Sequence, residues 1–148
     1  MGRMALLVEF DGARFHGWQR QASEPTVQEA LERALGAVAD RPVTVTAAGR
    51  TDSGVHALGM VAHFDAPVAR PPRAWVQGAN AHLPPGAAVL DAVPVAADFD
   101  ARRRATGRTY LYRILNRPAR PALEAGRVTC VREPLDPAAM AEGARALE

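Results

Sequence analysis

The sequence predicts an α+β fold of the ferredoxin-like type, with a mostly antiparallel sheet and helices on one face. Two observations lead to this fold class. Strand-like and helix-like segments follow one another in the order β-α-β-β-α-β, which is the split βαβ order, and turn residues separate them. The chain also has 148 residues, which is enough for one compact domain with its own core.

The first strand and the first helix have the clearest local signals. A strand is expected over residues 4–12, where an apolar run ends in the turn pair Asp11-Gly12. The polar and aromatic stretch 13–25 predicts an irregular loop. A helix should begin at Thr26, because Thr26 and Glu29 have capping-box spacing and apolar residues follow at helical spacing. Pro42 marks the end of this element.

The next four elements complete the expected sheet. β-branched residues predict a strand over 43–49, followed by a turn, and a second strand over 55–66 that is apolar on both faces and therefore central. Residues 70–84 predict a weaker helix that ends at Pro84. The strand predicted over 87–96 contains Pro94, which is typical of an edge or interrupted strand.

The remaining residues predict a strong strand over 106–116, a short one over 127–133, and a helix with Asp136 as N-cap and Pro137 in its first turn. That helix runs to Glu148 without a stop signal. We therefore expect residues 1–135 to form an N-terminal ferredoxin-like α+β domain, and residues 136–148 to be the start of a helix that leads into a further C-terminal half.

The composition excludes several classes of protein. Hydrophobic residues make up 48% and charged residues 23%, as in soluble globular proteins. No apolar run has the length of a membrane span or the pattern of a signal peptide, so we expect a cytoplasmic protein. One cysteine, Cys130, excludes an internal disulfide, and the four histidines lack metal-ligand spacing, so we expect no metal.

The basic residues are unevenly distributed. The chain has no lysine, so all 18 basic residues are arginines, and seven of them fall between Arg102 and Arg120, where there is no acid. Arginine binds phosphate through a planar fork and stacks on bases, so the cluster is compatible with nucleic acid. A solvated basic face is the alternative.

The segment AGRTDSGVHA, residues 48–57, places Asp52 in a turn between two strands. Arg50 is two residues away and favours an ionised carboxylate, which suits a nucleophile and not a general acid. A turn that only ties down a loop is the alternative. Asp52-Ser53-Gly54 also matches the triplet of aspartic proteases, but that chemistry needs two carboxylates and hence a dimer.

A second candidate surface lies in residues 99–116. In an unbroken strand, alternation would put Arg104, Thr106, Arg108, Tyr110 and Tyr112 on one face. Cations for phosphates and rings for unpaired bases make this a plausible RNA surface, with tyrosines that fill a core or interface as the alternative. The loop that contains His16, Trp18, Gln19 and Arg20 is a third, weaker candidate.

These three segments together resemble the TruA family of tRNA pseudouridine synthases. EFDGARFHGWQRQ is similar to the opening motif of that family, with Phe10 where many members carry tyrosine. AGRTDSGVHA is similar to its signature segment, and FDARRRATGRTYLYRI to its third motif. The resemblance covers essentially the whole chain and implies the N-terminal half of a pseudouridine synthase fold, with residues 1–135 as the catalytic domain.

The resemblance also implies an activity and its residues. The enzyme would be an isomerase that converts uridine to pseudouridine at positions 38, 39 and 40 of the tRNA anticodon stem-loop. Asp52 matches the nucleophile, Tyr110 matches the tyrosine that stacks on the target base, and Arg50 matches the arginine that fills the space left by the flipped base. Attack at C6 of the base and at C1′ of the sugar both stay open.

The implied partners are tRNA and a second copy of the chain in a homodimer, with no membrane and no cofactor. Family members carry a second, quasi-symmetric half that completes the sheet and the cleft, and it is absent from these 148 residues. Two other functions stay open on the residues alone: a non-catalytic RNA-binding module with the ferredoxin-like fold, and a dimeric aspartic hydrolase.

Overall fold

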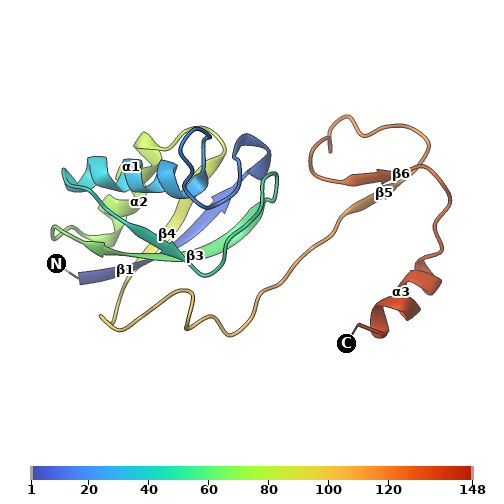
Figure 1. The fold of residues 1–148 in the computed structure, drawn as a ribbon. Helices are drawn as coiled ribbons and strands as arrows, with labels where there is room; N and C mark the ends of the chain where they lie inside the picture. Colours follow the sequence, from blue (N-terminus) through green and yellow to red (C-terminus); the bar gives the residue numbers. More distant parts are fainter. Residues whose placement is uncertain (1, 148) are drawn as a thin grey trace. The chain divides into compact units, whose positions relative to one another are not determined.

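The structure is a computed structural model that describes residues 2–147. It divides into two compact units, of which the first runs to Arg108 and the second begins at Thr109. The first unit contains a four-stranded sheet with two helices, and the second contains a two-stranded sheet and one helix (Figure 1).

The sheet of the first unit is fully antiparallel. Its strands are β1 (Gly2–Phe10), β2 (Val45–Ala47), β3 (Ala57–Ala66) and β4 (Ala87–Val95), and they lie in the order β2-β3-β1-β4. With helices between β1 and β2 and between β3 and β4, this is the split βαβ topology that the sequence predicts. The expected α+β, ferredoxin-like fold is confirmed.

Both helices cover the same face of the sheet (Figure 1). They are α1 (Val27–Ala39) and α2 (Pro72–His82). Thr26 is the N-cap of α1, and its hydroxyl oxygen accepts a hydrogen bond from the backbone N–H of Glu29 at 3.4 Å. The apolar stripe of α1 is buried against the sheet at Val27, Leu31 and Leu35, each 0% exposed, which is why this stretch is stable as a helix.

The core between helices and sheet is built on two aromatic side chains. Phe64 in β3 and Trp75 in α2 are 1% and 0% exposed, and their rings meet edge to face with centroids 5.0 Å apart. Alternate residues of β1 point into the same core, among them Leu6 and Val8. Pro94 lies in β4 and is opposite Met4 of β1. β4 is an edge strand, as its proline predicts.

Residues 98–104, which we call the strap, cover one end of the opposite face of the sheet. The guanidinium of Arg3 donates to the carbonyl oxygen of Phe99 at 2.7 Å, and the N–H of Ala101 donates to Nδ1 of His63 at 3.1 Å. Ala101 is 2% exposed. The strap therefore closes this end of the sheet without belonging to any strand.

The second unit is small and holds little buried surface. Its strands β5 (Ile114–Asn116) and β6 (Thr129–Val131) pair in parallel, and α3 (Pro137–Arg145) follows with Asp136 as its N-cap. The side-chain carboxylate of Asp136 accepts from the N–H groups of Ala138 and Ala139. The predicted start of this helix is thus confirmed.

The long strand predicted over 106–116 is wrong for most of its length. Only Ile114–Asn116 is a strand, and residues 105–113 have no regular secondary structure. A strand is stable only when its N–H and C=O groups pair with a neighbour. Within residues 105–113 of the described chain, only the carbonyl oxygen of Arg113 pairs with a strand, accepting from the N–H of Thr129 at 2.9 Å. The alternating pattern of residues 106–112 therefore does not correspond to a strand of a sheet.

Candidate functional site

Asp52 lies in the connection between β2 and β3, in a segment that we call the Asp52 turn, residues 50–56. The N–H of Val55 donates to the carbonyl oxygen of Asp52 at 3.2 Å and closes the turn. Gly54 has a φ of 84°, a left-handed conformation that glycine adopts without strain. Arg50 and Asp52 are both exposed, so the turn presents both side chains to solvent.

The carboxylate of Asp52 is not held by other side chains. Within residues 2–147, Asp52 forms no side-chain hydrogen bond and no ion pair, and Arg50 is not paired with it. Arg50 and Asp52 therefore form no ion pair, although both lie on one turn. An open carboxylate of this kind is free to approach a ligand.

The loop after β1 packs directly on the Asp52 turn. This loop begins with the short 3-10 helix η1 (Gly12–Arg14). The N–H of Trp18 donates to the carbonyl oxygen of Thr51 at 3.0 Å, and a Cβ atom on Gly17 would stand 2.7 Å from that same oxygen. The two segments are thus so close that glycine is required at the contact.

His56 makes a second connection between this loop and the Asp52 turn. Its Nδ1 lies 3.1 Å from the backbone N of Gly12 and 3.1 Å from a carboxylate oxygen of Asp11. The side chains of His56 and Asp11 are 32% and 27% exposed, so this cluster is half-buried beside the turn. The loop after β1 and the Asp52 turn, which lie far apart in the sequence, therefore pack together in the structure.

Arg108 joins the third motif to the residues that directly precede the Asp52 turn. Its guanidinium donates to the carbonyl oxygen of Ala48 at 2.6 Å, and its Nε would be 3.2 Å from a Cβ atom on Gly49. Arg104 forms an ion pair with Asp98 at 2.6 Å. Both arginines therefore have protein partners, which the expectation of a phosphate-binding face did not include.

Tyr110 belongs to the second unit and is 79% exposed. Tyr112 is 85% exposed. Residues 105–113 form no strand, so the alternation that would put Arg104, Thr106, Arg108, Tyr110 and Tyr112 on one face is not present. Within the described residues the two tyrosines fill no core, since both rings are open to solvent, and the alternative that they fill an interface stays a prediction.

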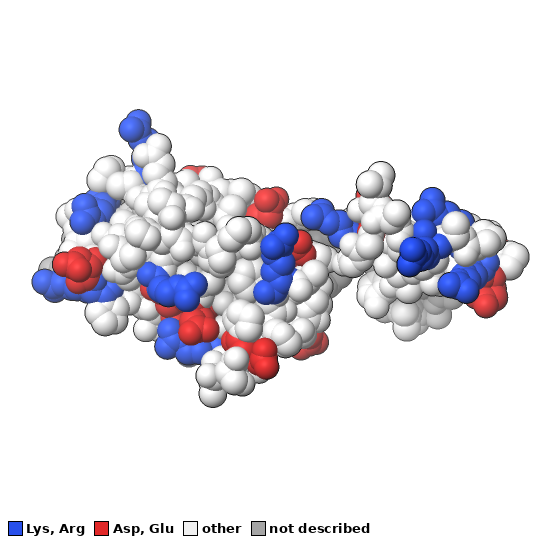
Figure 2. All heavy atoms as spheres, turned by 90° about the horizontal axis from the view of Figure 1, so that it is seen from above, with Lys and Arg blue, Asp and Glu red and all other residues white. Residues whose placement is uncertain are grey.

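On one face of the first unit, charged side chains of both signs are mixed. On the face shown in Figure 2, acidic and basic groups lie side by side over this unit. Arg102 and Arg103 are exposed, and in the described residues 2–147 neither guanidinium group makes a hydrogen bond or a close ion pair, although the charge of Arg103 acts on the carboxylate of Asp100. These two arginines of the strap are the ones available to an external phosphate.

The structure of residues 2–147 shows neither a metal-binding cluster nor a membrane-spanning helix. No group of three or more histidine, cysteine or acidic side chains is arranged to hold a metal ion among them. None of the helices in this range is long and apolar enough to cross a membrane.

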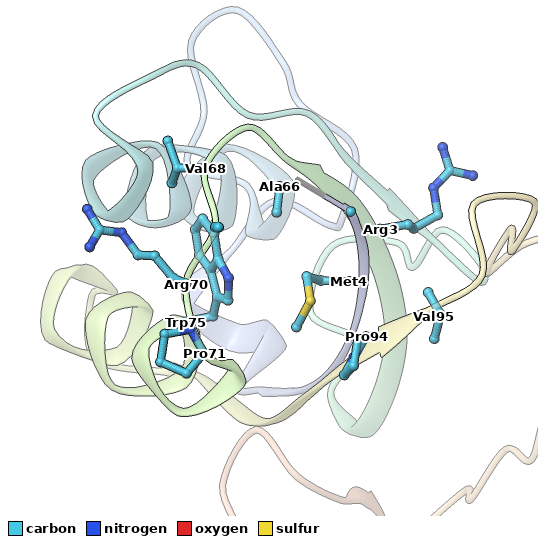
Figure 3. A pocket seen from close by; sticks show the side chains of 11 residues that line it. Arg3, Met4, Ala66, Val68, Arg70, Pro71, Trp75, Pro94 and Val95 are labelled. Carbon is cyan, nitrogen blue, oxygen red and sulfur yellow. The ribbon is translucent and has the colours of Figure 1, made fainter.

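A pocket of about 430 Å³ lies at the far end of the sheet from the Asp52 turn (Figure 3). It is lined by the start of β1, the ends of β3 and β4, and the start of α2. The indole of Trp75 lies on its wall, and the guanidinium groups of Arg3 and Arg70 point outward on opposite sides. It contains none of the site residues that the sequence predicts.

Sequence reasoning did not find the roles of His56, Asp11 and Gly12. His56 follows Asp52 within the same ten-residue segment, and in the sequence Asp11-Gly12 indicates only a turn. The available signal was the position of two polar side chains: Asp11 directly follows one predicted strand, and His56 lies at the start of another. The contact between them becomes visible only when β1 and β3 are placed side by side, with Phe10 opposite Ala57.

The chain is similar to known proteins over nearly its whole length. A family model described as tRNA pseudouridine synthase matches residues 6–102, a range that includes Arg50 and Asp52 and ends before Tyr110. The tRNA pseudouridine synthase A of Dechloromonas aromatica is 60% identical over 140 residues, which cover 95% of this chain and 53% of that protein.

Two further relatives agree with this. The tRNA pseudouridine synthase A of Xanthomonas oryzae pv. oryzae is 51% identical over 147 residues, or 98% of this chain and 57% of that protein. That of Idiomarina loihiensis is 48% identical over 145 residues, or 98% and 56%. The chain spans about half the length of the curated relatives it matches, and it belongs to the tRNA pseudouridine synthase family.

Proposed function

We propose that the protein to which this chain belongs isomerises uridine to pseudouridine at positions 38, 39 and 40 of the tRNA anticodon stem-loop. The observation that carries the proposal is Asp52, an exposed carboxylate without a side-chain partner among residues 2–147, on a turn fixed by the loop after β1. The family membership and the names of the relatives support the reaction.

Asp52 is the nucleophile in this proposal. It attacks either C6 of the base or C1′ of the sugar, the C1′–N1 bond breaks, and the uracil turns over. A C1′–C5 bond then forms, the bond between Asp52 and the substrate breaks to regenerate the carboxylate, C5 loses its proton, and N1 gains one. The atoms balance without an external group, so the reaction requires no cofactor. A nucleophile of this kind needs an accessible carboxylate, as Asp52 has.

The target base must leave the stack to reach Asp52, which costs a few kcal/mol. In the proposal the ring of Tyr110 stacks on the flipped base, and Arg50 occupies the space that the base leaves. Both side chains are exposed and therefore available for RNA. Base–aromatic stacking contributes about 1–3 kcal/mol and offsets the cost of flipping.

The assembly and the location of the protein are part of the same proposal. The enzyme acts as a homodimer in the cytoplasm, with residues 1–135 as the N-terminal catalytic domain. The length of the relatives supports a further half that completes the site.

The deciding experiment is tritium release from tRNA that contains 5-tritiated uridine, with the full-length protein. Asp52→Asn and Asp52→Ala should abolish release and leave tRNA affinity intact. Asp91→Asn, an exposed carboxylate on β4, is the matched control and should release tritium like the wild type. Release by Asp52→Ala would remove Asp52 as the nucleophile. Binding of tRNA without release by the wild type would instead favour a non-catalytic RNA-binding module.

A further inference from the structure

The position of the Asp52 carboxylate depends on the backbone of its turn. In the part of the chain that the structure describes, no hydrogen bond or ion pair holds the side chain of Asp52. The turn is closed by one internal hydrogen bond, from the N–H of Val55 to the carbonyl oxygen of Asp52. Contacts that hold the two arms of the turn therefore determine where the carboxylate lies.

The two arms are held by the same loop but in different ways. The first arm is fastened through the backbone, by the hydrogen bond from Trp18 to Thr51. The second arm is fastened through a side chain, because Nδ1 of His56 accepts from the N–H of Gly12 at 3.1 Å. Ser53 adds a hydroxyl at 3.5 Å from the carbonyl oxygen of Phe15, the longest of these contacts.

Nδ1 of His56 has two adjacent partners that require different protonation. When it carries no proton, it accepts from the N–H of Gly12; when it is protonated, it donates to the carboxylate of Asp11, also 3.1 Å away. A single nitrogen cannot do both at once. Because Asp11 and Gly12 are consecutive, either arrangement keeps the imidazole attached to the same place.

The segment that His56 contacts is itself fixed to the sheet. The N–H of Asp11 donates to the carbonyl oxygen of Gly86 at 2.7 Å, at the start of β4, and the carboxylate of Asp11 accepts from the N–H of Ala13. Further along the loop, Trp18 is 2% exposed and packs on Phe10. The loop is therefore a rigid support for the turn.

We propose that His56 is a positioning residue for Asp52: by binding the Asp11–Gly12 segment, its imidazole sets where the Asp52 carboxylate meets the target uridine. The inference rests on the proposed function and deepens it. Catalysis is sensitive to such placement, since a displacement of about 1 Å can lower the rate about 100-fold.

The test compares His56→Ala with His56→Asn in the full-length protein. The amide of asparagine presents an acceptor close to the position of Nδ1, whereas alanine presents none. We expect His56→Ala to lower kcat for tritium release by about 100-fold with KM for tRNA unchanged, and His56→Asn to restore most of kcat. His82→Ala, at the exposed end of α2, is the histidine control and should behave like the wild type.

Thermal denaturation of each variant separates positioning from loss of fold. If His56→Ala does not fold, His56→Asn is compared with His56→Gln. Asparagine, the shorter of the two, keeps its acceptor near the position of Nδ1, and glutamine does not. Three outcomes would overturn the proposal. A folded His56→Ala variant could keep the wild-type kcat, or its KM could rise as much as its kcat falls. Equal kcat values for His56→Asn and His56→Gln are the third.

The same assay keeps this proposal apart from the proposed function. Asp52→Asn is measured in parallel. Inactive Asp52→Asn together with fully active His56→Ala rejects only the role of His56. Tritium release by Asp52→Asn rejects Asp52 as the nucleophile, and His56 then has nothing to position.

Discussion

The backbone carbonyl oxygen of Val55 occupies the space that a Cβ atom on Gly12 would need. Gly12 begins the loop after β1, and Val55 lies in the Asp52 turn, so two segments more than forty residues apart are in contact through their backbones. No side chain, however flexible, can relieve a clash at this point. The contact therefore reports directly on the distance between loop and turn.

Replacing Gly12 with alanine should push the loop and the Asp52 turn apart. Overpacking of this kind costs about 1–3 kcal/mol, and the N–H of Gly12 would also move away from His56. We expect Gly12→Ala to lower both the melting temperature and kcat for tritium release. Gly143→Ala, where a Cβ atom meets nothing within 4 Å, is the control and should leave kcat unchanged. Wild-type kcat in Gly12→Ala would show that the spacing does not matter.

The stability of the first unit should fall as the solution becomes acidic. Burial lowers the pKa of His63 below 6.5, as does the nearby Arg3 guanidinium, while the carboxylates of Asp100 and Asp65 oppose this shift. The unfolded chain therefore takes up a proton before the folded one does. The contribution of neutral His63 to the free energy of unfolding is fully present above about pH 6.5. It decreases as the pH falls below that value.

Denaturant titrations between pH 7.5 and pH 5 check this prediction, with His63→Asn as the comparison. The amide oxygen of asparagine can accept from the N–H of Ala101 at any of these pH values, so the slope with pH should flatten. An equal slope in both proteins would assign the pH dependence to other groups.

The first ninety-five residues show how much a sequence can predict. The capping pair Thr26 and Glu29, the apolar stripe of α1 and the proline in β4 are local signals, and each corresponds to the element it predicts. They succeed because tertiary packing and local preference agree along this stretch.

The stretch 105–113 shows where sequence reasoning stops. Its alternation describes which residues would share a face, but a strand also needs a partner, and a single sequence does not name that partner. The contact of His56 with Asp11 and Gly12 was missed for a related reason. It depends on the register of β1 against β3, which no local pattern encodes.

The N-cap of α1 gives a prediction of stability alone. Thr26 is 1% exposed, and its hydroxyl accepts from the N–H of Glu29. Thr26→Ala should lower the free energy of unfolding by about 1 kcal/mol, and Thr26→Ser by less, because serine keeps the acceptor. Chemical denaturation measures the difference. Equal losses in the two variants would show that the methyl group, not the cap, is responsible.

The arginines of the strap should differ in their effect on RNA binding. Neither Arg102 nor Arg103 makes a side-chain hydrogen bond or a close ion pair within residues 2–147, whereas Arg104 is paired with Asp98. If the strap meets phosphates, Arg102→Ala and Arg103→Ala should each reduce the slope of log affinity against log salt by about 0.7–0.9, and Arg104→Ala by less. Filter binding of tRNA across a salt series tests this, and unchanged slopes would identify a solvated face.

The attachment of the strap to the sheet makes Ala101 a sensor of the whole first unit. Its amide belongs to no helix or strand, yet its hydrogen can exchange with deuterated solvent only when the bond to His63 breaks and the strap lifts away. Its protection factor should therefore match those of β1 and β3 near neutral pH and collapse first on acidification. One amide outside the regular structure would then report when the sheet uncovers its second face.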